Sequence, residues 1–88
     1  MPEAPASGVI TNRIRKLRFE NGEMTQEELA KLVGVNRHTI MAIEAGKYAP
    51  SLLLAFKIAA AFHQPLERVF IYQPYLREPE GAAGAEIP

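Results

Sequence analysis

The sequence contains no cysteine among its 88 residues. Without cysteine the chain forms no disulfide, and it offers neither a thiolate nucleophile nor a cysteine-ligated zinc site. It also lacks any apolar run approaching the roughly 18 residues that a membrane-spanning helix needs. The first residues, MPEAPASG, are acidic and contain proline, a composition unlike that of a secretory signal. These absences predict a cytoplasmic protein.

Motifs of catalysis are missing as well. The chain has no GxGxxG, no Walker loop, no HExxH, and no Ser/His/Asp set that the fold would bring together. Its two histidines, His38 and His63, stand apart from any cluster of metal-ligating residues. Residues 71–88 are too few for a sensor domain. We therefore expect no enzyme activity, no metal, no cofactor and no small-molecule ligand.

The charge is unevenly distributed, although ten Lys or Arg and ten Asp or Glu give a formal net charge of zero. Residues 9–72 hold nine of the basic and six of the acidic residues and therefore carry +3, whereas the segment from 73 onward carries −2. This mildly basic body is compatible with a nucleic-acid partner. A charged stretch on a helix is, however, usually a solvated face.

The middle of the chain has helical periodicity throughout and no strand-like alternation of any length. We expect residues 1–9 to be a flexible segment and residues 73–88 to be a partly disordered tail, because both are rich in proline, glycine, alanine and glutamate. One domain remains between them, residues 10–72. Short Gly, Asn and Pro signals divide it into five helices, which predicts an all-α fold.

The strongest start signal belongs to the second helix. Thr25 is its N-cap, Glu28 follows three residues later as in a capping box, and Gly34 ends the helix. The first helix is expected at about 11–20. Boundaries of the other helices come from Asn36, Gly46, Ser51 and Pro65.

The second and third helices, roughly residues 25–45, are joined by a tight turn. Ala30 stands where two such helices approach most closely, and Gly34 allows a backbone conformation that residues with a β-carbon resist. The apolar positions that would pack both helices on the core are Leu29, Val33, Val35, Ile40 and Ile43. A DNA-reading helix-turn-helix requires this combination.

The third helix would then present its polar surface to DNA. If Ile40 and Ile43 face the core, the outer surface carries Arg37, His38, Met41, Ala42 and Ala45. Recognition helices enter the major groove by their N-terminal residues. Arg37 can pair with guanine in bidentate fashion, and the methyl group of Ala42 suits a thymine methyl. The alternative is that Arg37 only clamps a phosphate and that His38 is an ordinary surface residue.

The stretches TQEELAKLVGV and NRHTIMAIEAGKYAPSLLLAFKIAAAF resemble the Cro/C1-type (XRE-like) regulators related to lambdoid phage repressors, especially short stand-alone bacterial ones. The resemblance covers about residues 10–72 and implies a compact five-helix, lambda-repressor-like domain that binds double-stranded DNA. It implies a phosphate contact by Gln26 and a partly buried salt bridge between Arg18 and Glu44. The positions that it implies for base contacts are Arg37, His38, Thr39 and Ala42.

Three residues beside the third helix are further candidates for phosphate contacts: Asn36, Lys47 and Tyr48. Capping alone would explain Asn36, and the other two could equally be ordinary surface residues. His63 replaces a glycine that the family has after the fourth helix. We therefore expect a non-glycine helix cap there, with some backbone strain.

Apolar residues exceed what one small core needs. The fourth helix carries a stripe expected to face the core, Leu52, Ala55, Ile58, Ala59 and Phe62, and a second face of Leu53, Phe56 and Ala60. This surplus predicts a homodimer that reads operator half-sites about 34 Å apart. The candidate interface residues are Leu53, Phe56, Phe70, Ile71, Tyr72 and Tyr75. The alternative is that the segment 70–76 folds back on its own core.

The function that these patterns predict is sequence-specific binding of double-stranded DNA by a small transcriptional repressor acting at the nucleoid. The main rival is an antitoxin-like or adaptor protein whose tail holds another protein, with DNA binding reduced to autoregulation or absent.

Overall fold

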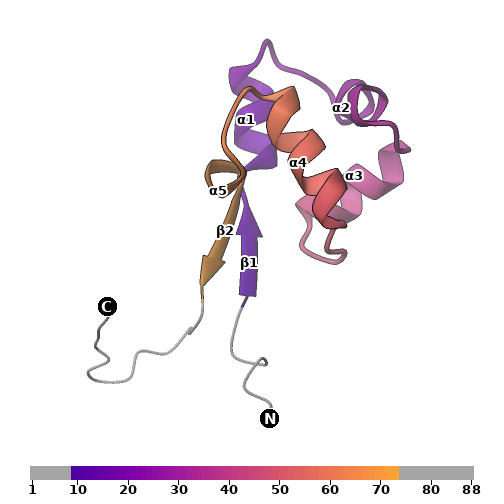
Figure 1. Ribbon diagram of the computed structural model, residues 1–88. Helices are drawn as coiled ribbons and strands as arrows, with labels where there is room; N and C mark the ends of the chain where they lie inside the picture. Colours follow the sequence, from indigo (N-terminus) through magenta and orange to yellow (C-terminus); the bar gives the residue numbers. More distant parts are fainter. Residues whose placement is uncertain (1–8, 74–88) are drawn as a thin grey trace, which may run out of the picture.

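The structure, a computed structural model, describes residues 9–73, which contain five helices and two short strands (Figure 1). The helices are α1 (Ile14–Glu20), α2 (Gln26–Val33), α3 (Arg37–Glu44), α4 (Leu52–Ala61) and α5 (Leu66–Val69). The strands are β1 (Val9–Asn12) and β2 (Phe70–Gln73). The five helices agree with the prediction, and the predicted tail beyond Gln73 lies outside the described residues. None of the described helices is long and apolar enough to cross a membrane.

The two strands form an antiparallel ribbon in which Ile10 lies opposite Tyr72 and Asn12 lies opposite Phe70. The all-α prediction therefore holds only for the helical body. Four residues per strand are too few to show an alternation, and the strands lie at opposite ends of the domain sequence. Because residues 9–12 belong to β1, the first helix begins at Ile14 and not at 11. Residues 70–73 form β2 and pair with β1 of the same chain.

The helices enclose one core. Its fully buried side chains include Ile14, Leu29, Ile40, Ile58, Phe62 and Val69. The prediction that Leu52 faces this core was wrong, because Leu52 is 68% exposed whereas Leu54 is only 9% exposed. The two leucines flank the buried stripe of α4 on opposite sides. Leu54 belongs to the core cluster, and Leu52 borders an open groove.

Local capping fixes the helix ends as predicted. The Thr25 hydroxyl accepts a hydrogen bond from the Glu28 backbone at 2.9 Å, and the Glu28 carboxylate accepts one from the Thr25 backbone at 2.9 Å. Asn36 and Ser51 cap α3 and α4 through their side chains. His63 has a φ of 56°, so the expected non-glycine cap with a left-handed backbone is confirmed.

Candidate nucleic-acid interface

The turn between α2 and α3 is built from its backbone. Gly34 has a φ of 81°, in the left-handed region, which reverses the chain directly after α2. The Ala30 carbonyl accepts hydrogen bonds from Gly34 and Val35, at 2.9 and 3.0 Å. Ala30 itself is buried, with 2% of its surface exposed. These two hydrogen bonds and the left-handed Gly34 therefore define the short turn that leads from α2 to α3.

The N-terminal end of α3 faces solvent. Arg37 and His38 are exposed, and within residues 9–73 neither side chain takes part in a hydrogen bond or ion pair. Thr39 is half-buried, and its hydroxyl donates to the Asn36 side chain at 3.1 Å. Ala42 is also half-buried, while Ile40 and Ile43 are buried in the core. The four residues suggested for base contacts thus lie along α3. The two longest side chains, those of Arg37 and His38, are at its solvent-exposed N-terminal end.

Four residues named for phosphate contacts surround α3. Gln26 is the first residue of α2, and Asn36 caps α3 through its side-chain oxygen, at 2.9 Å from the Thr39 backbone nitrogen. Lys47 and Tyr48 are exposed in the loop after α3. The backbone N–H of Lys47 donates to the carbonyl of Ala42 at 2.9 Å, which fixes this loop against the end of α3.

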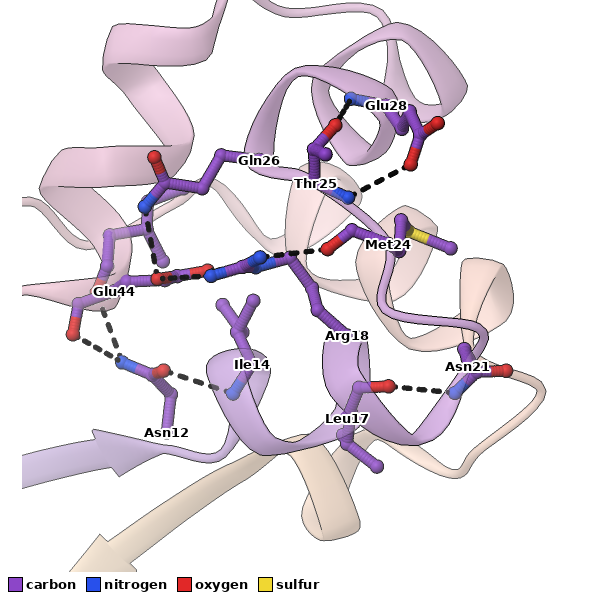
Figure 2. A network of polar contacts seen from close by, with 11 residues as sticks. Asn12, Ile14, Leu17, Arg18, Asn21, Met24, Thr25, Gln26, Glu28 and Glu44 are labelled. Atoms are coloured by element: carbon purple, nitrogen blue, oxygen red, sulfur yellow. Dashed lines mark hydrogen bonds and ion pairs between the residues drawn. The ribbon is translucent and has the colours of Figure 1, made fainter.

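Glu44, the acidic residue of α3, is neutralised by a network of polar contacts (Figure 2). The Glu44 carboxylate accepts hydrogen bonds from Arg18 at 2.6 and 3.3 Å and from the Gln26 amide at 3.1 Å. Arg18 also donates to the carbonyl of Met24 at 2.8 Å. The side chains of Arg18 and Glu44 are 9% and 11% exposed. The ion pair that the resemblance implied is present, and it keeps a negative charge on α3 away from solvent.

Two contacts of this network escaped the sequence analysis. Figure 2 shows the Asn12 amide beside the C-terminal end of α3, where it donates to the carbonyl of Ile43 at 3.0 Å. Its side-chain oxygen accepts a hydrogen bond at 3.2 Å from the backbone N–H of Ile14, the first residue of α1. Gln26 turns its amide NH₂ toward Glu44. No sequence signal links Asn12 to α3.

Two short helices joined by a left-handed glycine turn, with an exposed second helix, define a helix-turn-helix domain. A family model described as Helix-turn-helix matches residues 14–69. The chain therefore belongs to the Cro/C1-type helix-turn-helix family of DNA-binding transcriptional regulators.

Known proteins similar to this chain bear related names. An uncharacterized HTH-type transcriptional regulator of Archaeoglobus fulgidus is 58% identical over 63 residues, which cover 72% of this chain and 89% of that protein. The cryptic phage CTXphi transcriptional repressor RstR of Vibrio cholerae is 34% identical over 58 residues, 66% of this chain and 51% of the repressor. The crystal structure of the restriction-modification controller protein C.AhdI from Aeromonas hydrophila superposes with a TM-score of 0.58 and 33% identity, covering 62% of this chain and 82% of C.AhdI.

Proposed function

We propose that this protein represses transcription by binding, as a homodimer, to a pseudo-palindromic operator, with α3 in the major groove. The observation that carries the proposal is the exposed N-terminal turn of α3. Arg37 and His38 stand there without partners among residues 9–73, while Glu44, the one acid of that helix, is held by Arg18. A recognition helix needs unengaged donors at this end and no unpaired negative charge near phosphates.

The base contacts follow from the chemistry of these side chains. Arg37 presents the planar fork that pairs with the O6 and N7 atoms of guanine. His38, the next residue, donates or accepts a single hydrogen bond. Ala42 lies one turn further along α3 and brings a methyl group toward the base edges. Thr39 is half-buried, and its hydroxyl donates a hydrogen bond to Asn36. It contacts a base through its methyl group, or its hydroxyl gives up the bond to Asn36 for one to a base.

The phosphate contacts surround the base-reading surface. Lys47 and Tyr48 lie in the loop fixed to the end of α3, within reach of a strand that passes beside the helix. The Asn36 oxygen is engaged in capping, so its NH₂ group is the part left to donate to a phosphate. The NH₂ group of Gln26 donates one of its two N–H groups to Glu44. Its second N–H and the backbone N–H groups at the start of α2 are therefore the donors that meet the phosphate.

A dimer explains the apolar surface that the fold leaves in water. Leu53, Phe56 and Tyr72 are 66%, 52% and 64% exposed, and Phe70 and Ile71 are half-buried. The remaining candidate of the sequence analysis, Tyr75, lies outside the described residues. Two copies related by a two-fold axis would read two half-sites one helical turn apart, about 34 Å. The name of the phage relative RstR supports repression as the direction of regulation.

Selection from a random pool of DNA duplexes at near-physiological salt tests the function. We expect an inverted repeat whose half-site centres are about one helical turn, roughly 10 base pairs, apart. Arg37→Ala should remove the preference at one position of each half-site, with a loss of about 1–3 kcal/mol in discrimination. Lys57→Ala is the matched control, because Lys57 is an exposed residue of α4 and not of α3.

Two outcomes would contradict the proposal. If nothing enriches and bulk DNA is bound weakly, the protein is not a direct regulator, and the antitoxin-like or adaptor role becomes the better account. If Arg37→Ala and Lys57→Ala weaken binding equally and leave the sequence preference intact, α3 does not read the bases.

A further inference from the structure

The outer surface of α1 carries an excess of positive charge. A shallow hollow on it is lined by three basic residues, one acid and two other residues: Arg13, Arg15, Lys16, Glu20, Asn12 and Phe19. The side chains of Arg15 and Lys16 are exposed, and Phe19 is 53% exposed. The DNA contacts proposed for α2, α3 and the loop after α3 leave this surface unused.

The Phe19 ring has two arginine neighbours. The guanidinium carbons of Arg15 and Arg18 each lie 5.6 Å from the centre of the ring. A cation within about 6 Å of a ring centre is attracted by the negative face of the ring. Arg18 and Phe19 follow Arg15 by three and four residues, so all three side chains share one flank of α1.

The two arginines differ in their other contacts. Arg18 is 8% exposed and donates to the Glu44 carboxylate and to the Met24 carbonyl. Arg15 is exposed, and among residues 9–73 its guanidinium takes part in no hydrogen bond or ion pair. An aromatic ring that holds a guanidinium group by its face leaves the N–H donors at the edge of that group open. Arg15 therefore presents a positioned planar cation, which suits a phosphate or a carboxylate.

The flank of α1 that carries Arg15 adjoins the start of α2. Figure 2 shows Arg18 reaching from α1 to the Glu44 carboxylate, which the Gln26 amide meets from α2. Phe19 lies beside Arg18, and Arg15 lies beside Phe19. Since Gln26 and the N–H groups at the start of α2 are proposed to meet a phosphate, this series of contacts leads from that phosphate to Arg15.

We propose that Arg15, held against the Phe19 ring, binds a phosphate of the DNA strand that passes the start of α2, outside the base pairs that α3 reads. The neighbouring phosphate-binding positions and the excess of cations in the hollow favour a nucleic acid over an acidic protein segment. Phe19 is a positioning residue, because it acts through Arg15. The inference rests on the proposed function and deepens it by adding α1 to the DNA-binding surface.

A phosphate contact strengthens binding without selecting a sequence. We expect Arg15→Ala to weaken binding about tenfold on any duplex, as the loss of a charge-assisted hydrogen bond does. The slope of log affinity against log salt concentration should become shallower by about 0.9 for each half-site. Phe19→Leu keeps the charge and removes the ring, so it should weaken binding about two- to fivefold and leave the slope almost unchanged.

The matched control is Lys16→Ala. Lys16 lines the same hollow and carries the same charge, but among the described residues it makes no contact of this kind with the Phe19 ring. It should leave the salt slope unchanged. Because all three substituted side chains are exposed, we expect the variants to fold, and thermal unfolding followed by circular dichroism checks this.

The test combines fluorescence anisotropy titrations at several salt concentrations with ethylation interference, both on the selected operator and on a bulk duplex. Ethylation of a phosphate removes its negative charge, so it weakens binding only where the protein contacts that phosphate. One phosphate in each half-site, beyond those beside α3, should be sensitive to ethylation with the wild type and with Lys16→Ala and insensitive with Arg15→Ala.

Three results would overturn the contact. The first is a wild-type salt slope and ethylation pattern for Arg15→Ala, after which an acidic segment of another protein would be the better ligand. The second is an equal effect of Arg15→Ala and Lys16→Ala, which would reduce the role of Arg15 to the overall charge of the hollow. The third is wild-type affinity for Phe19→Leu, which would remove the ring from the arrangement.

The proposed function fails in a different way. A wild type that enriches no sequence from the random pool is not the regulator proposed above, whatever residue stands at position 15. The salt slopes on the bulk duplex still decide the Arg15 contact in that case, because a phosphate contact does not depend on sequence.

Discussion

Arg18 of α1 donates to the Glu44 carboxylate of α3 at 2.6 Å, and this contact connects the first helix directly to the helix proposed to read DNA. Both side chains are almost entirely buried. Gln26 and the Met24 carbonyl complete the surroundings of the pair. The same contact thus supports the fold and neutralises an acidic charge on the helix proposed to read DNA.

Glu44→Ala should lower the free energy of unfolding by about 3 kcal/mol, because it leaves the Arg18 guanidinium buried without its counter-charge. Urea denaturation measures the change. Glu20→Ala is the control, since Glu20 is an exposed acid at the end of α1, and it should shift stability by no more than about 0.5 kcal/mol. An equal effect of both substitutions would show that the pair is not structurally important.

Replacing both partners should recover much of that loss. Arg18→Met combined with Glu44→Met leaves no unpaired charge, and buried ion pairs are often exchanged for apolar residues at little cost. The double variant should therefore be more stable than Glu44→Ala in urea denaturation. A double variant as unstable as the single one would mean that the hydrogen bonds of Arg18 with Met24 and of Glu44 with Gln26 dominate instead.

Asn12→Ala should cost about 1–2 kcal/mol of stability, because one side chain satisfies backbone groups at two helix ends. Its oxygen accepts a hydrogen bond from the N–H of Ile14 at the start of α1, and its NH₂ group donates to the carbonyl of Ile43 at the end of α3. Thr11→Ala, one residue earlier in β1, removes a solvent-exposed side chain and serves as the control. A comparable destabilisation by Thr11→Ala in urea denaturation would assign the effect to the strand and not to the two contacts of the Asn12 side chain.

The sequence predicted those features whose determinants lie within a few residues of one another. The capping box of Thr25 and Glu28 spans three residues, and the turn at Gly34 depends on one φ angle, so both could be identified from the sequence. The β1–β2 ribbon could not, because the pairing of Ile10 with Tyr72 joins residues at opposite ends of the described chain. The contact of Asn12 with Ile43 is long-range for the same reason.

In the candidate site, too, the sequence predicted what depends on neighbouring residues and missed what depends on long-range contacts. Helical spacing placed Arg37 and His38 on the outer surface of α3, where the structure has them. Spacing could not decide between Leu52 and Leu54, since both flank the stripe of α4 and only the packing of the folded domain buries one of them. It also gave no indication that the Gln26 amide turns toward Glu44.

His63→Gly should raise stability by about 1 kcal/mol, because the histidine holds a left-handed backbone that a residue with a β-carbon adopts only with strain. Gly34→Ala tests the reverse change. A Cβ atom at Gly34 would meet nothing within 4 Å, so the expected loss of about 1 kcal/mol comes from the backbone alone. Thermal unfolding of both variants measures the two effects. Destabilisation by His63→Gly would show that the imidazole contributes more than its backbone strain removes.

Lys47→Ala should weaken DNA binding to all sequences by a similar factor and leave the preferred sequence unchanged, because a lysine bound to phosphate carries no base information. The slope of log affinity against log salt concentration should become shallower by about 0.9, the change expected on duplex DNA when the protein neutralises one phosphate fewer. Lys57→Ala removes the same charge from α4 and should leave the slope unchanged. Fluorescence anisotropy titrations between about 50 and 200 mM salt cover the range in which this dependence is steep. Equal slopes for wild type and Lys47→Ala would place Lys47 outside the DNA interface, and equal reductions in affinity for the two lysine variants would reduce its role to the overall charge of the domain.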